Sequence, residues 1–185
     1  MSSEFDFDDG YGLVPAHYHR NPDGSLGGWV ADTATISPKA FIGSSASVGG
    51  GARVLDEAVI KGDAQIYGDA LVKDNAVVNG PVKIFGQAVI CNQARILQSA
   101  IICDEAEISG DVRVYGNAII RGKADVGGKA RVYGRAEVKD QALVEGVAVI
   151  AGNASISGVM HVNAGCVGIF NTASIVLQEL DNWIG

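Results

Sequence analysis

The sequence predicts an all-β protein, a single-domain, three-sided parallel β-helix of about seven coils of 18 residues each. Two observations carry this prediction. Ile or Val occupies every sixth position from Val30 to Val162 without exception, and from Ile36 onward Ala stands two residues before each of them except at Val82, Val112 and Met160. A period of six fits neither the 3.6 residues of a helical turn nor the simple alternation of a long strand. The chain must therefore turn every six residues, and three short strands close one coil.

Each Ile or Val should form the centre of a short strand, with its β-branched side chain inside and the small Ala fitting a tight corner. Stacked coils then pair their strands at about 4.8 Å. Gly precedes Asn, Asp or Lys after several strands, for example at Gly68 and Gly116, which suits corners that need positive φ. The absence of proline after Pro81 agrees with continuous strand pairing.

The chain divides into three segments: an acidic N-terminal segment and cap (1–28), the repeat (29–162) and a C-terminal cap (163–185). Between Thr33 and Val162 there are 13 acidic and 13 basic residues, so the net charge of −7 comes from the ends. Such an acidic end is typically mobile and solubilising. Trp29 is expected to close the apolar interior at the entry, and Val176, Leu177, Leu180 and Trp183 to form the final cap.

The segment His19-Arg-Asn-Pro-Asp-Gly-Ser-Leu-Gly-Gly-Trp-Val30 resembles the entry of YdcK-like hexapeptide proteins. The repeat is similar to the left-handed β-helix of the hexapeptide superfamily over about 130 of the 185 residues. This resemblance implies left-handed coils, trimers packed side by side, and acyltransferases that use a histidine base. Only the resemblance gives the hand, since crossover chirality favours a right-handed path, and bactofilins are the right-handed alternative.

Grouping the strands by 18 residues places outward side chains on three unlike faces. On one face Arg95, Arg113 and Arg131 stack beside Tyr115 and Tyr133, a stripe suited to carboxylates, a polyanion or an acidic partner surface. The alternative is that these residues stack for local stability, balanced by acidic corner residues. A second face carries Glu107 and Asp125 in register. These seven residues are the candidate partner-binding residues.

Outward aliphatic and aromatic side chains also cluster. Val59 and Val77 continue the arginine face toward the N-terminus, and the third face carries Ile101, Ile119, Tyr67 and Phe85. Clustered apolar residues on a surface indicate contact with another chain. We therefore expect a homo-oligomer with these six residues at its interfaces, and the resemblance favours a trimer.

Candidates for chemistry are few. His161 is the only histidine of the repeat and the one candidate for a catalytic base, although a solvated side chain in the last regular coil is the simpler interpretation. His17 and His19 alternate as two metal ligands on a strand would, but surface histidines are the commoner case. We expect no cofactor. Cys91, Cys103 and Cys166 suit reduced thiols, and with no apolar membrane span in the sequence they favour a cytoplasmic protein.

Three functions remain open. The first is a non-catalytic oligomeric scaffold or protein-binding module, of bacterial or phage origin. The second is a hexapeptide-type acyltransferase, which would use an acyl-CoA and rests on fold kinship alone. The third is an inhibitor that mimics nucleic acid with its acidic residues, which the neutral body disfavours. Direct nucleic-acid binding is not expected, because three arginines among balancing carboxylates produce little positive field.

Overall fold

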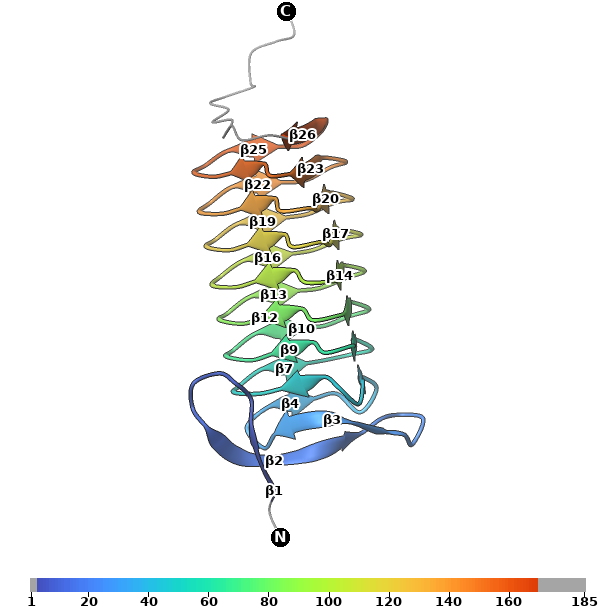
Figure 1. Cartoon of the computed structure of the whole chain (residues 1–185). Helices are drawn as coiled ribbons and strands as arrows, with labels where there is room; N and C mark the ends of the chain where they lie inside the picture. Colours follow the sequence, from blue (N-terminus) through green and yellow to red (C-terminus); the bar gives the residue numbers. More distant parts are fainter. Residues whose placement is uncertain (1–2, 170–185) are drawn as a thin grey trace, which may run out of the picture.

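The computed structural model describes residues 3–169 and confirms an all-β, three-sided parallel solenoid (Figure 1). Eight coils stack along one axis, one more than the repeat count suggests, because the strand at Cys166–Ile169 completes the last coil. Within the described residues no helix is long and apolar enough to cross a membrane.

Three sheets form the sides, and each coil contributes one strand to every sheet. Sheet A consists of β1 (Ser3–Asp6), β2 (Leu13–Arg20), β3 (Leu26–Ala31), β6 (Ser47–Val48), β9 (Gln65–Ile66), β12 (Lys83–Ile84), β15 (Ile101–Ile102), β18 (Ile119–Ile120), β21 (Glu137–Val138) and β24 (Ser155–Ile156). Sheet B consists of β4 (Thr35–Ile36), β7 (Arg53–Val54), β10 (Leu71–Val72), β13 (Val89–Ile90), β16 (Glu107–Ile108), β19 (Asp125–Val126), β22 (Leu143–Val144) and β25 (His161–Val162). Sheet C consists of β5 (Phe41–Ile42), β8 (Val59–Lys61), β11 (Val77–Asn79), β14 (Arg95–Leu97), β17 (Arg113–Val114), β20 (Arg131–Val132), β23 (Val149–Gly152) and β26 (Cys166–Ile169).

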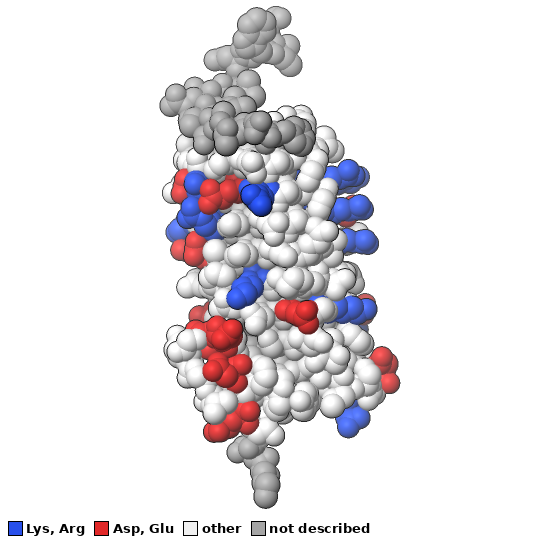
Figure 2. Space-filling model, in the orientation of Figure 1, with Lys and Arg blue, Asp and Glu red and all other residues white. Residues whose placement is uncertain are grey.

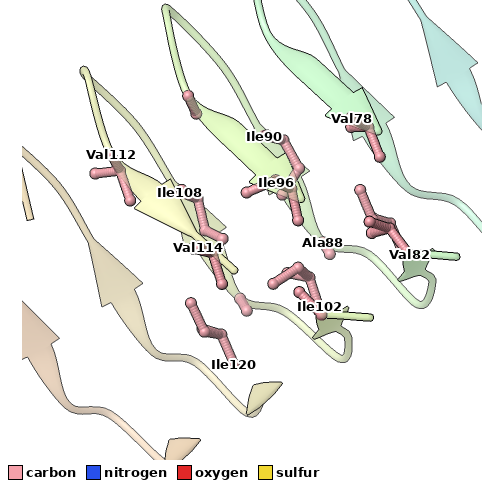
Figure 3. Packing of buried hydrophobic residues seen from close by; sticks show 14 of the residues in the cluster. Val78, Val82, Ala88, Ile90, Ile96, Ile102, Ile108, Val112, Val114 and Ile120 are labelled. Atoms are coloured by element: carbon pink, nitrogen blue, oxygen red, sulfur yellow. The ribbon is translucent and has the colours of Figure 1, made fainter. Parts of the chain in front are cut away.

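The interior is a continuous apolar column made by the periodic Ile and Val side chains. From Ile42 to Ile156 each of them is at most 1% exposed, and the residue two positions before each, which is Ala except at Val82 and Val112, is buried as well. Figure 3 shows how Ile90 and Ile108, or Ile96 and Val114, stack directly above one another in successive coils. A closely packed interior accepts only β-branched aliphatic side chains of similar size at the inward position of each strand, which explains the strict repeat.

The corners are made by residues with positive φ, as the sequence predicts for Gly68 and Gly116, and not by the alanines. Every residue two positions after an inward side chain, from Gly50 to Gly158, has positive φ. Most of them are glycines; the others are Asp56, Asp74, Asn92, Gln98, Asp104 and Asp140. Asn and Asp tolerate the left-handed conformation because a short polar side chain can hydrogen-bond locally. The alanines are thus core residues that precede each strand, and the left-handed residue makes the turn.

The corner side chains also tie one coil to the next. Asp104 Oδ2 accepts a hydrogen bond from the Gly122 backbone N–H at 2.9 Å, and Asp140 does the same for Gly158 at 2.9 Å. At another corner Asn92 Oδ1 accepts the Gly110 N–H at 3.0 Å. These bonds satisfy backbone donors that the two-residue strands leave outside the sheets.

The N-terminal end is closed by an antiparallel hairpin rather than by Trp29. Strand β1 pairs with β2, and β2 pairs with β3 across the base of the stack (Figure 1). Trp29 is half-buried on the outer side of sheet A, stacked between Phe5 and Tyr18 with ring centroids 4.9 and 4.1 Å away. Phe7 is 2% exposed. The acidic segment is thus folded onto sheet A from Ser3 onward and is not a mobile tail.

Asn21 closes the edge of sheet C. Its Oδ1 accepts the Ile42 N–H at 2.8 Å and its Nδ2 donates to the Ile42 carbonyl oxygen at 3.0 Å. The amide therefore replaces the missing neighbour of β5, the first strand of that sheet. Gly27 lets the two segments meet, because a Cβ there would lie 2.6 Å from the same carbonyl oxygen.

The repeat changes after Val162, as the sequence indicates. Val149 pairs with Cys166 and Ile150 with Val167, a spacing of 17 residues where earlier coils use 18. The corner before β26 is thus one residue shorter. The proposed cap residues Val176, Leu177, Leu180 and Trp183 lie outside the described residues.

Candidate protein-binding surface

Sheet C carries the three arginines in one straight column. Arg95 pairs with Arg113 and Arg113 with Arg131 in the parallel register, and all three side chains are exposed. Beside them the rings of Tyr115 and Tyr133 stack with centroids 4.8 Å apart and an interplanar angle of 3°. We call these five residues the Arg–Tyr surface.

The guanidinium groups of this column have no counter-ion in the described chain. None of them forms an ion pair or hydrogen bond there, whereas ion pairs do form elsewhere, such as Arg121–Glu137 at 2.8 Å and Lys123–Glu105 at 3.1 Å. The expected balancing by acidic corner residues is therefore not found. Figure 2 shows basic groups in a column along the side that carries sheet C. Like charges opposite one another on neighbouring strands are destabilising, so we expect the three arginines to lower the stability of the isolated chain.

Sheet B carries the acidic counterpart. Glu107 pairs with Asp125 in register, and both side chains are exposed. Partial burial raises the pKa of Asp125, and repulsion from Glu107 and Glu145 raises it further. Neither Glu107 nor Asp125 forms an ion pair within residues 3–169. We call this pair the acidic column.

The apolar candidates occupy two faces. Val59 and Val77 pair in register on sheet C below the arginines, each half-buried by its neighbours. On sheet A, Ile101 pairs with Ile119. Tyr67 and Phe85 follow their inward residues on that sheet and stack at 5.0 Å with an interplanar angle of 1°. The structure therefore does not gather the six interface candidates into one patch.

The histidines do not form a recognisable reactive centre. His161 lies in β25, the last strand of sheet B, where its Nε2 contacts Glu145 Oε1 at 2.8 Å with 45% of each side chain exposed. His17 contacts Asp32 at 2.7 Å. Burial lowers the pKa of His19, a hydrogen bond with the Ala40 backbone opposes this, and His17 lowers the pKa further. Among the described residues no group of three His, Cys, Asp or Glu side chains is placed to hold a metal.

Two hollows of the surface lie away from the Arg–Tyr surface. One of about 380 Å³ lies where Phe5–Asp8 cross sheet A beside Trp29. Another of about 660 Å³ lies at the corner near Lys39, Asp56 and Asp74. The Arg–Tyr surface is an open strip on a flat sheet, and such a shape suits an extended macromolecular partner better than a small molecule, which needs a concave site.

Sequence reasoning located the columns but missed Asn21 and most corner residues. The six-residue spacing was a usable signal for the corners, because every Asp, Asn or Gln that replaces a corner glycine lies two residues after an inward position. The single Asn21 has no periodic signal. Its only marker is the pair of glycines at 27 and 28 that bring the chain close to it.

The fold and these surfaces define a β-solenoid repeat protein whose distinguishing chemistry lies on its outer faces. The family model described as YdcK beta solenoid repeat matches residues 64–80 and 106–122. The chain is accordingly a YdcK-like β-helix. No curated protein and no solved structure matches it.

Proposed function

We propose that this protein is a non-catalytic scaffold that binds an acidic protein surface through the Arg–Tyr surface. The observation that carries the proposal is the column of Arg95, Arg113 and Arg131, which is exposed, in register and without counter-ions in the described chain. Arg is suited to this role because its planar guanidinium donates two parallel hydrogen bonds to one carboxylate.

The rigidity of the solenoid adds to the binding energy. The strand register holds neighbouring arginines about 4.8 Å apart, so the spacing of the charges is set before a partner arrives. A preorganised surface loses less conformational entropy on binding than flexible basic residues would. The stacked rings of Tyr115 and Tyr133 provide a flat apolar border with hydroxyl groups that can hydrogen-bond. We expect a carboxylate-rich strand or loop to lie along the column.

A peptide titration tests this function. A synthetic Glu-rich decapeptide, titrated into the full chain at low salt by calorimetry, should bind, and a Lys-rich decapeptide should not. Arg95→Gln/Arg113→Gln/Arg131→Gln should weaken the affinity at least tenfold. The control Arg53→Gln/Lys73→Gln/Lys83→Gln removes the same charge from sheets A and B.

The control triple variant should change the affinity less than threefold, and binding should weaken as salt rises because the contacts are exposed. Equal losses in the two triple variants would show that only net charge matters. If the wild-type chain bound neither the Glu-rich nor the Lys-rich decapeptide, the proposal would be refuted.

The other two functions have less support. An acyltransferase would need a base in a cleft, and His161 is a half-exposed side chain paired with Glu145. A nucleic-acid mimic would need carboxylates in long regular arrays. Several of the N-terminal acids instead accept hydrogen bonds within their own turns, Asp6 from the Asp8 N–H and Asp9 from the Tyr11 N–H. The proposal keeps the expected cytoplasmic location, where reduced thiols persist.

A further inference from the structure

We propose that the acidic partner of the Arg–Tyr surface is a second copy of this chain, docked with its sheet B against sheet C of the first. The inference rests on the proposed function, because it needs the arginine column to bind carboxylates. It commits the acidic column, Glu107 and Asp125, to the role of the bound group.

The two columns lie at the same heights along the solenoid. Each coil passes from sheet B directly to sheet C, so β16 and β17 are consecutive strands of one coil, as are β19 and β20. Glu107 therefore lies at the level of Arg113, and Asp125 at the level of Arg131. If two copies stand side by side with parallel axes and no vertical shift, each carboxylate faces one guanidinium of the neighbour.

The coils next to these two levels match as well. One coil beyond the arginines, sheet B carries Leu143 and sheet C carries Val149, both half-buried. Two coils before Glu107, the corresponding pair is Leu71 and Val77, also half-buried. Apolar side chains thus face apolar side chains on each side of the ion pairs, where they exclude water and strengthen the charged contacts.

Two levels between Arg53 and Val149 depart from this match, and at the first of them Arg53 faces Val59. Val89 faces Arg95, whose aliphatic stem can lie on the valine while its guanidinium reaches toward the neighbour's Glu107. Raising one copy by a coil would keep both ion pairs, as Glu107 with Arg95 and Asp125 with Arg113, but would place Arg131 against Leu143. Both registers therefore keep the charge pairing, and the proposal uses the unshifted one, in which Leu143 faces Val149.

The isolated chain has unfavourable electrostatics on both faces. Three guanidinium groups repel one another on sheet C. On sheet B, burial and repulsion from Glu107 and Glu145 raise the pKa of Asp125. Facing the two columns relieves both repulsions at once, as complementary charge does at specific interfaces.

The geometry also determines the kind of assembly. Sheet B of each copy contacts sheet C of the next, so the interface is heterologous and every copy has two neighbours. Without a vertical shift the copies are related by rotation alone, and such a contact generates a ring where the rotation closes, whereas a one-coil shift would generate an open filament.

Charge reversal tests the pairing. The full wild-type chain should show one discrete oligomeric mass by light scattering after size exclusion. Glu107→Lys/Asp125→Lys and, separately, Arg113→Glu/Arg131→Glu should each reduce that mass to the monomer. The variant with all four changes restores opposite charges across the contact and should regain the wild-type mass. Circular dichroism and urea unfolding should show that every variant keeps the wild-type fold.

The outcomes separate this inference from the proposed function. Glu107→Lys/Asp125→Lys leaves the Arg–Tyr surface unoccupied and should bind the Glu-rich decapeptide at least as tightly as the wild type. A monomeric wild type that binds the peptide would overturn the self-docking and keep the proposed function. An oligomer that persists in both double variants, or a fourfold variant that stays monomeric, would also overturn the self-docking. Failure of the monomeric double variant to bind the peptide would overturn both proposals.

Discussion

Replacing Asn21 should loosen the N-terminal end of sheet C. The Asn21 side chain is 4% exposed and supplies both a donor and an acceptor to Ile42 of β5. In Asn21→Ala the Ile42 N–H and carbonyl oxygen lose their partners in a closed site. Each buried polar group left unsatisfied costs about 1–3 kcal/mol, so with two such groups the free energy of unfolding should fall by about 2–6 kcal/mol.

Two measurements follow from this estimate. Urea unfolding reports the loss of overall stability, and hydrogen exchange of the Ile42 amide reports the local opening directly. A domain of this size shifts its melting temperature by roughly 2–4 °C per kcal/mol, so a drop of at least about 4 °C is expected. The control Asn117→Ala removes an exposed corner amide and should stay within about 0.5 kcal/mol of wild type.

Asn21→Asp sharpens the test. The carboxylate can still accept the Ile42 N–H, but it cannot donate to the carbonyl oxygen, and it places a charge in a buried site. This nearly isosteric variant should therefore lose at least as much stability as Asn21→Ala near neutral pH. Two unsatisfied buried groups should cost more than about 1 kcal/mol. If both variants changed the free energy of unfolding by less than this and the exchange rate of the Ile42 amide were unaltered, the role of Asn21 as a cap of sheet C would be refuted.

The remaining predictions concern the coils. Gly28→Ala should destabilise by at least about 2 kcal/mol in urea, because its Cβ would overlap a backbone oxygen, whereas Gly127→Ala has nothing closer than 3.6 Å and should be neutral. Asp104→Ala should lower the free energy of unfolding by about 1–3 kcal/mol, because it removes a hydrogen bond and places an alanine in the left-handed conformation. Asp104→Asn keeps the hydrogen-bond acceptor and tolerates positive φ, so it should unfold like wild type. Because its pKa is raised in the folded chain, Asp125 destabilises the monomer above that pKa. Asp125→Asn should stabilise the monomer at pH 7, and the gain should vanish as pH falls below the unfolded pKa; a gain that persists in acid would contradict this.

The period of the sequence was sufficient to predict the interior and the register. Because coils repeat without insertion, a residue and its partner 18 positions later must stack, and the pairing of Arg95 with Arg113 follows from arithmetic alone. The corners were predicted only in part. Positive φ was predicted at corner glycines, but not at the aspartate, asparagine and glutamine residues that take the same position in other coils.

The ends were the least predictable part, for a physical reason. A terminal coil has a neighbour on one side only, so its unpaired edge must be covered by residues outside the repeat. Such residues occur once, as Asn21 does, and a search for periodicity passes over them. Trp29 was expected to close the apolar interior at the entry. Its position one residue before the inward Val30 points it outward, as strand alternation requires.

The regular interior also decides how function can be distributed on this molecule. Since every coil buries the same kind of side chain at the same place, the interior cannot distinguish one level from another. Only the outward positions carry a pattern along the axis, and on sheets B and C these patterns differ in sign at the same two levels. After a single substitution in a column, the charged residues of the neighbouring coils remain about 4.8 Å away. They can still contact a bound partner and so reduce the loss of affinity. Variants that change a whole column, or reverse two facing columns together, are therefore the ones that separate a specific surface from general charge.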